Sequence, residues 1–305
     1  MSREGTGNRE RGTDAASSQL AAGSPGSPIP VPSSHLAGKI LLYATLILGA
    51  ALALLPILWM VSASLMPTGE ASTFPPRVLP SRVTFEHYTA LFTRLNLGRY
   101  LFNSALISFV VTIFSLAVNS MAGYAFAKLR FRGRDRVFQL LSAGLVLPVQ
   151  VAMLPLFLVM KQLGLINSYW GVIIPGLASI FGIFLIRQYA QSIPDDMLDA
   201  ARIDGASELR IYRSVVLPGI LPILATLAIW TFLATWNDFM WPLIVLSDES
   251  HYTLPVALAN LVGEHVQDTE LMMAGSVLTT LPVLLVFLFL QRYYIQGVMA
   301  GSVKG

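Results

Sequence analysis

The sequence predicts an all-α membrane protein with six transmembrane helices and both termini in the cytoplasm. The 305-residue chain is 54% hydrophobic and only 12% charged, about half the charged fraction of an ordinary soluble domain. The deficit falls in six runs with at most one Asp, Glu, Lys or Arg each, and every run reaches the ~20 residues that a helix needs to cross a bilayer. Backbone groups in lipid must satisfy their own hydrogen bonds, which favours helix in all six. The runs are Ile40–Met66, Tyr100–Ala127, Val137–Met160, Leu163–Ile186, Ser214–Ser247 and Leu271–Gln291.

Charge asymmetry predicts the orientation. With the N-terminus inside, the cytoplasmic segments hold 15 of the 20 Lys and Arg residues. The last outer segment, Asp248–Glu270, holds five acids and no Lys or Arg. Cytoplasmic loops of membrane proteins carry such an excess of basic residues. Topology therefore explains the net charge of +3; we expect a lipid bilayer around the chain and no nucleic-acid partner.

The expected organisation follows from these runs. Residues 1–38, rich in Gly, Ser, Pro and Ala, cannot bury enough apolar surface to fold and are expected to form a disordered cytoplasmic tail. Residues 39–98 hold the first transmembrane helix, too long for a signal peptide and expected to remain as an anchor, and an outer loop. Residues 99–292 form the membrane core with a cytoplasmic loop at 193–213, and residues 293–305 form a cytoplasmic tail.

The sequence lacks the residues that several kinds of catalytic or binding site require. The chain has no cysteine, which excludes disulfides and thiol catalysis. It has no G-x-x-x-x-G-K-[ST] motif with which to hold ATP. No catalytic triad order or metal-ligand cluster stands out, so we expect neither an enzyme nor a bound cofactor.

The stretch Asp199–Pro218, "DAARIDGASELRIYRSVVLP", is the longest charged interlude in the second half of the chain. Pro194 and the acids that follow it predict a helix start, and Gly205 predicts its end in a left-handed turn. Ser207 can cap a second helix that enters the membrane. Ala200 and Ala201 let another surface approach closely. The simpler alternative is a helix lying on the lipid headgroups.

The spacing of this stretch resembles the signature loop of permease subunits of binding-protein-dependent ABC importers. That loop reads Glu-Ala-Ala-x3-Gly-x9-Ile-x-Leu-Pro. Here Asp199 replaces the Glu and Val215 replaces the Ile, while Gly205 and Leu217–Pro218 match. The layout from residue 39 onward is similar to the carbohydrate branch, most of all to its maltose-type second permease subunit. The segments that carry this likeness are "AFAKLRFRGRD" (125–135), "WNDFMWPL" (236–243) and "QGVMAGSVKG" (296–305).

The resemblance implies the type I fold of ABC importer permeases and an inner-membrane location. It implies import of a sugar or related polyol with a second permease subunit, a cytoplasmic ATPase dimer and an extracytoplasmic solute-binding protein. It also implies that the loop docks on the ATPase and that the C-terminal tail reaches toward it. The residues concerned are Asp199, Ala200, Ala201, Asp204, Gly205, Leu217 and Pro218 in the loop and Gly301, Ser302, Val303, Lys304 and Gly305 in the tail.

Five polar residues within the apolar runs are candidates for the translocation pathway, because polar groups inside a membrane are costly. The alternative is that they form hydrogen bonds between helices. Asp238 is expected about 30 Å along its helix from Leu217, near the outer boundary. The five are Asn103, Asn119, Gln150, Asn237 and Asp238.

Two other classes of protein compete with an importer subunit. A stand-alone secondary transporter should show internal repeats or buried paired charges, and neither is found beyond Asp238. A membrane-embedded enzyme should show catalytic groups clustered at bilayer depth, which the sequence lacks.

Overall fold

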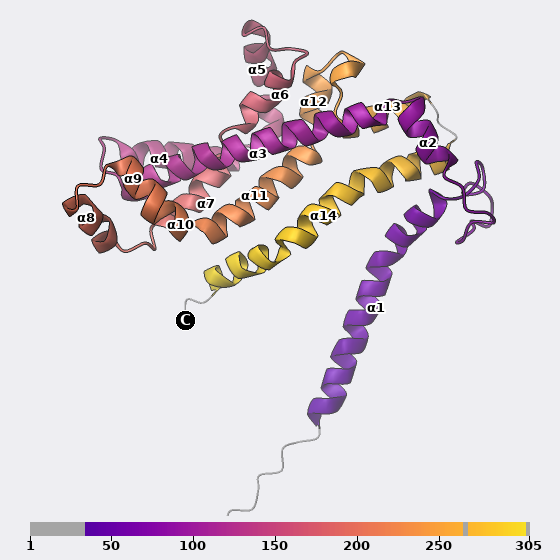
Figure 1. The fold of residues 1–305 in the computed structure, drawn as a ribbon, viewed down its shortest axis with the longest axis horizontal. Coiled ribbons are helices and arrows are strands. Elements are labelled where there is room, and N and C mark those ends of the chain that lie inside the picture. Colours follow the sequence, from indigo (N-terminus) through magenta and orange to yellow (C-terminus); the bar gives the residue numbers. More distant parts are fainter. Residues whose placement is uncertain (1–33, 265–267, 303–305) are drawn as a thin grey trace, which may run out of the picture. The chain divides into compact units, whose positions relative to one another are not determined.

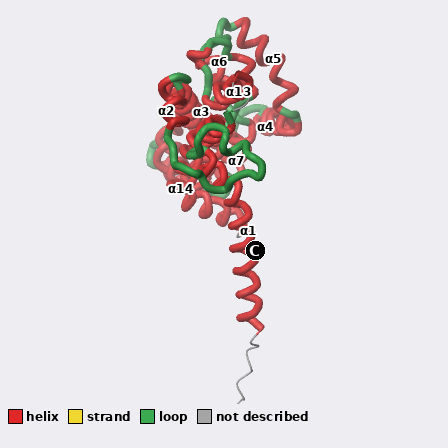
Figure 2. Tube along the Cα trace, turned by 90° about the vertical axis from the view of Figure 1, so that its right-hand side faces the viewer, coloured by secondary structure: helices red, strands yellow, loops and turns green. Residues whose placement is uncertain are grey.

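The structure is a computed structural model that describes residues 34–264 and 268–302. It divides into two compact units, residues 1–55 and 56–305. Helices and loops, without a strand, make up the part of the chain that is described (Figure 2). The helices before residue 193 are α1 (Ser34–Ala63), α2 (Glu86–Thr93), α3 (Leu97–Lys128), α4 (Arg134–Ala143), α5 (Val149–Gln162), α6 (Tyr169–Gly176) and α7 (Ile180–Ala190). They are followed by α8 (Asp195–Ile203), α9 (Glu208–Ile211), α10 (Leu217–Gly219), α11 (Leu221–Trp236), α12 (Met240–Val245), α13 (Leu254–Glu264) and α14 (Thr269–Ser302).

The described residues confirm an all-helical membrane fold with up to six spans. Four single segments are long and apolar enough to cross a bilayer, and two bent helix pairs bring the total to six if each pair is one span. The single segments are Gly38–Ala63, Leu97–Lys128, Tyr169–Ala190 and Thr269–Phe289. α1 begins at Ser34 and α14 continues to Ser302, so both helices extend into segments expected to be tails. The remainder of the expected N-terminal tail, residues 1–33, lies outside the described residues.

The third apolar run, Val137–Met160, is not the single helix that its length predicted. α4, with a short 3-10 turn, and α5 meet at an angle of 110°. Leu147 is extended, with ψ of 126°, and the next residue is Pro148. A proline disfavours helical backbone in the residue before it, which explains the position of the break.

The fifth run, Ser214–Ser247, is broken as well, which corrects the expectation of one long helix. The segment Glu208–Gly219 meets α11 at 79°, between Pro218 and Pro222, which cannot donate helical hydrogen bonds. α11 then ends at Trp236 and α12 begins only at Met240. Asp238 therefore lies between two helices and not along one.

Within the second unit, α3 is the central helix, and α7 and α11 pack along it (Figure 1). Three groups of buried apolar residues follow one another along α3. The group at its N-terminal end includes Leu91, Leu97, Phe232 and Trp236; the middle group includes Ile107, Val111, Val172 and Trp241; the group at its C-terminal end includes Tyr124, Ile186, Leu198, Ile211 and Val216.

The contact between α3 and α7 depends on glycine. A Cβ atom on Gly123 of α3 would lie 2.6 Å from Cγ2 of Ile186 and 3.1 Å from the backbone nitrogen of Arg187. A Cβ on Gly182 of α7 would lie 2.7 Å from Nδ2 of Asn119. Small residues are what allow helices to approach so closely in membranes.

We expect Gly123→Leu to destabilise the protein, since the added side chain forces α3 and α7 apart. Overpacking of this kind costs about 1–3 kcal/mol. The measurement is the thermal unfolding temperature and membrane abundance of the variant. Gly49→Leu is the matched control, because a Cβ at Gly49 has no atom within 4 Å. Equal behaviour of the two variants would contradict the close packing.

Candidate functional site

The stretch between α7 and α11 folds as the helix, turn and helix that the sequence predicted. α8 starts directly after Pro194 with Asp195 and Asp196 in its first turn. Gly205 has a φ of +78°, in the left-handed region that favours glycine. Ser207 is the N-cap residue of α9, but its side chain makes no capping hydrogen bond, so that detail of the prediction is wrong. A π-helical turn, Tyr212–Val216, then leads into α10.

α8 has one buried side and one free side. Leu198 is 1% exposed within the group at the C-terminal end of α3, and Ala201 packs half-buried against the same group. On the free side Met197 is 54% and Ile203 87% exposed, and Ala200 is exposed too. A helix of nine residues thus presents an apolar face that the described part of the chain does not cover.

The other loop residues singled out from the sequence fall around this face. Asp199, Asp204 and Gly205 are exposed. Leu217 is half-buried against the C-terminal group of α3, and Pro218 is exposed. In the tail, Gly301 and Ser302 end α14, while Val303, Lys304 and Gly305 lie outside the described residues.

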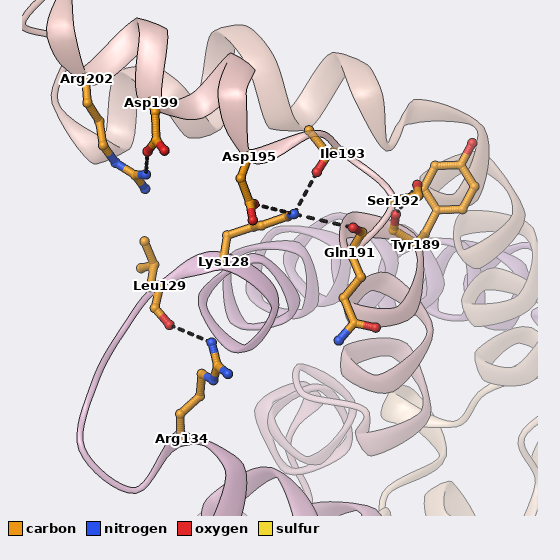
Figure 3. A network of polar contacts seen from close by, with 10 residues as sticks. All are labelled: Lys128, Leu129, Arg134, Tyr189, Gln191, Ser192, Ile193, Asp195, Asp199 and Arg202. Carbon is orange, nitrogen blue, oxygen red and sulfur yellow. Dashed lines mark hydrogen bonds and ion pairs between the residues drawn. The ribbon is translucent and has the colours of Figure 1, made fainter.

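Lys128, the last residue of α3, fixes the start of α8 (Figure 3). Its ammonium group donates to Oδ1 of Asp195 at 2.7 Å, to the carbonyl oxygen of Ile193 at 2.6 Å and to that of Gln191 at 3.4 Å. The lysine side chain is only 8% exposed. The hydrogen bond and charge of Lys128 hold the pKa of the Asp195 carboxyl below its ordinary value.

A second set of polar contacts links the middle of α8 to α3. Arg202 donates to Oδ1 of Asp199 at 2.7 Å and to Oε1 of Glu208 at 2.9 Å. The hydroxyl of Tyr124 on α3 donates to the other oxygen of Glu208 at 2.7 Å. The bonds to Glu208 and Asp199 raise the pKa of the Arg202 guanidinium further above its ordinary value, so this cation is permanent.

The sequence pointed to Asp199 and to the acids after Pro194, but not to the residues that hold them in place. These are Lys128, Arg202, Glu208 and Tyr124. The three-residue separation of Asp199 and Arg202 was a visible signal of a helical ion pair. The partnership of Lys128 with Asp195 had no such signal, since 67 residues separate them.

The five polar residues within the apolar runs fall into two groups. The amide of Asn103 donates to the carbonyl oxygens of Ser250 and Tyr252 and accepts from the hydroxyl of Tyr169. Asn119 donates to Oγ of Ser115 and accepts from the backbone of Ser179. Both residues are buried and join α3 to neighbouring segments.

Gln150, Asn237 and Asp238 instead line one cavity of about 560 Å³. It lies beside the break between α11 and α12, and its other walls come from α3, α5 and α6. Trp241 closes one side and is held in place by a 3.1 Å hydrogen bond from its indole nitrogen to the carbonyl oxygen of Gly171. The break before α5 and the break between α11 and α12, neither of which the sequence predicted, thus bring Gln150 close to Asn237 and Asp238.

Across residues 34–264 and 268–302, no group of three His, Cys, Asp or Glu side chains is placed to hold a metal ion. The site therefore consists of two features. One is a rigidly anchored helix with a free face, and the other is a polar-lined cavity at a helix break. Neither feature contains the paired groups that bond-breaking chemistry needs.

Comparison with known proteins identifies the family of this chain. Residues 119–299 match the family described as "Binding-protein-dependent transport system inner membrane component". The arabinooligosaccharides transport system permease protein AraQ of Halalkalibacterium halodurans is 39% identical over 84% of this chain and 93% of its own length. The lactose transport system permease protein LacG of Rhizobium radiobacter is 34% identical over 87% of this chain and 96% of its own length.

Two solved structures are similar. A bacterial ABC transporter involved in the import of the acidic polysaccharide alginate matches 88% of this chain and 100% of its own, with a TM-score of 0.77 at 26% identity. A bacterial alginate ABC transporter in complex with an alginate pentasaccharide-bound periplasmic protein shares the fold, with a TM-score of 0.62 at 15% identity over 84% of this chain and 94% of its own.

These matches confirm the resemblance seen in the signature loop and give a stand-alone secondary transporter no support. The matching proteins are permeases, in keeping with a subunit that has no P-loop of its own. The chain belongs to the family of binding-protein-dependent transport system inner membrane components, as a multi-pass protein of the inner membrane.

Proposed function

We propose that this chain is one of two permease subunits of an ATP-driven sugar importer, and that residues 193–213 couple it to a cytoplasmic ATPase dimer. The single observation that carries the coupling role is the free apolar face of α8 on a helix that Lys128 holds rigidly to α3. An apolar face left open beside a charged loop suits docking on a protein better than contact with water. Relatives named for arabinooligosaccharide and lactose transport support a sugar as cargo.

The partners follow from the same proposal. A second permease completes the translocation pathway, as the resemblance to the maltose-type second permease subunit implies. An extracytoplasmic solute-binding protein delivers the sugar, as the periplasmic protein in the alginate complex suggests. From the family resemblance, residues Gly301–Gly305 form a second contact with the ATPase. Movement of α8 as a rigid body with α3 would then switch the pathway between outward and inward access.

The orientation is the first testable part. The charge asymmetry predicts that both termini lie in the cytoplasm. Reporter fusions after Gly98, Asn167 and Gly263 should read as outside, and fusions after Asp135 and Gly205 as inside. An inside signal at Gly263 would contradict this topology and with it the access of α8 to a cytoplasmic ATPase.

The turn after α8 provides the second test. Gly205→Val should reduce ATPase co-purification and sugar uptake while membrane abundance stays normal. A Cβ at Gly205 has open space around it, so the cost comes from the left-handed backbone and amounts to about 1–2 kcal/mol. Gly205→Asn is the matched control, since Asn tolerates this conformation. If Gly205→Val binds the ATPase and transports like the wild type, α8 is a surface helix on the headgroups.

The Lys128 anchor provides the third test. Lys128→Met keeps the stem but removes the three donors, leaving two carbonyl oxygens without a partner at about 1–3 kcal/mol for each buried one. We expect faster amide hydrogen exchange at residues 191–196 and weaker coupling of ATP hydrolysis to uptake. Lys161→Met, at an exposed lysine at the end of α5, is the control.

The anchor also predicts a pH dependence. The pKa of Asp195 is lowered by Lys128, so its stabilising contribution is complete above the ordinary carboxyl pKa of about 3.9 and is lost only as pH falls through the folded value. Hydrogen exchange at residues 191–196 should therefore show no change in protection between pH 6 and pH 8 beyond the intrinsic exchange rate. A titration in that range would contradict the assignment of Asp195 as the partner of Lys128.

A further inference from the structure

The cavity between α5 and the α11–α12 break has the features of a ligand site. Its volume of about 560 Å³ falls in the range of small-molecule pockets. Residues 237–239 leave helical geometry inside an apolar run, and non-helical backbone at membrane depth is tolerated where it lines a cavity or is buried in protein. α5 begins directly after the break at Leu147–Pro148, and its residue Gln150 lines the cavity.

The polar side chains in this cavity have donors and acceptors that are not used in hydrogen bonds within the protein, unlike the side chains of Asn103 and Asn119. Asp238 accepts from the backbone amides of Trp241 and Met240, and a carboxylate has about four acceptor sites. The amide nitrogen of Asn237 donates to the carbonyl oxygen of Leu233. Among the described residues, the amide oxygen of Asn237 accepts no hydrogen bond and the side chain of Gln150 makes none.

The walls between these groups are apolar. Met153, Leu156, Val172, Phe239 and Trp241 lie around the three polar side chains. Saccharides combine apolar C–H faces with hydroxyl groups that donate and accept. A carboxylate accepts from such hydroxyls, amides can do both, and aromatic faces pack on the C–H surface.

The charge of the residues that line the cavity restricts the charge of a ligand that can bind there. Asp238 is its one ionisable residue, and no Lys or Arg lines the cavity. In an environment of low dielectric constant an unbalanced carboxylate repels an anion strongly. A uronate or sugar phosphate entering here would meet this charge without a cation to offset it.

We propose, on the basis of the sugar-importer function above, that this cavity contacts the passing substrate and that the substrate is a neutral or cationic saccharide, not an anionic one. Asp238 accepts from its hydroxyls, and Gln150 and Asn237 orient it. The proposal assigns a substrate class to this chain's own residues, independently of what the solute-binding protein selects.

The test uses cells in which the gene for this chain is deleted and then restored as wild type, Asp238→Asn or Glu86→Gln. Asn can still receive the amides at the start of α12, so the variant removes the charge and keeps the local fold. Glu86→Gln makes the same change at an exposed outer residue. The cells receive neutral, amino-sugar and uronate oligosaccharides of two to five units, and mass spectrometry measures what accumulates inside.

We expect chain-dependent accumulation of neutral or amino-sugar members only. Asp238→Asn should lower it about ten-fold, in line with the loss of a charge-assisted hydrogen bond, while Glu86→Gln transports normally. Accumulation of uronates, or unchanged uptake by Asp238→Asn, would overturn the proposal.

ATPase co-purification from the same membranes separates the two levels of inference. If the wild type and Asp238→Asn both retain the ATPase but uptake does not change, the substrate assignment fails and the importer function stands. If the wild type binds no ATPase and accumulates no saccharide, the importer function fails and takes the substrate assignment with it.

Discussion

The arrangement of the described helices depends on the close approach of α3 to α7. At this contact, neither Gly123 nor Gly182 has room for a Cβ atom. Asn119 of α3 also accepts a hydrogen bond from the backbone of Ser179, directly before α7. In lipid the hydrophobic effect does not drive helices together, so tight packing stabilises a helix pair through dispersion interactions. The three buried groups along α3 then follow, because each forms where another element packs against this pair or its neighbour α11.

The proposed coupling element, α8, is attached to the same helix pair, and its contacts differ in strength. Lys128 is almost completely buried and satisfies two carbonyl oxygens and a carboxylate, so it is the principal anchor of α8. The pair of Asp199 and Arg202 is 64% and 36% exposed, and exposed pairs contribute about 0–1 kcal/mol. Asp199 can therefore exchange its partner at little cost, which suits a residue that meets another protein.

Broken helices create the cavity. If the third and fifth apolar runs were straight helices, Gln150 and Asp238 would lie on two separate helices. The depth of each residue in the membrane would then depend only on its position along its own helix. The 110° bend before α5 and the break between α11 and α12 instead bring Gln150, Asn237 and Asp238 to one cavity that Val111 of α3 also lines. The break between α11 and α12 leaves an acid, Asp238, inside an apolar run, and acids in such positions are typical of sites that handle polar substrates.

The sequence alone determined the helical membrane class, the family and the helix–turn–helix of the loop at residues 193–213. Run length, charge asymmetry and the spacing of Asp199, Gly205 and Pro218 are local properties, and the left-handed turn at Gly205 follows from the residue itself. Only the tertiary structure decided where apolar runs break and which polar residues meet. Eight prolines lie in the six apolar runs, and the neighbours of each decide whether a helix bends there or stays straight. Asn103 and Asn237 are alike in sequence, yet the first is saturated by Tyr169 and Tyr252 and the second faces a cavity, because their partners come from distant parts of the chain.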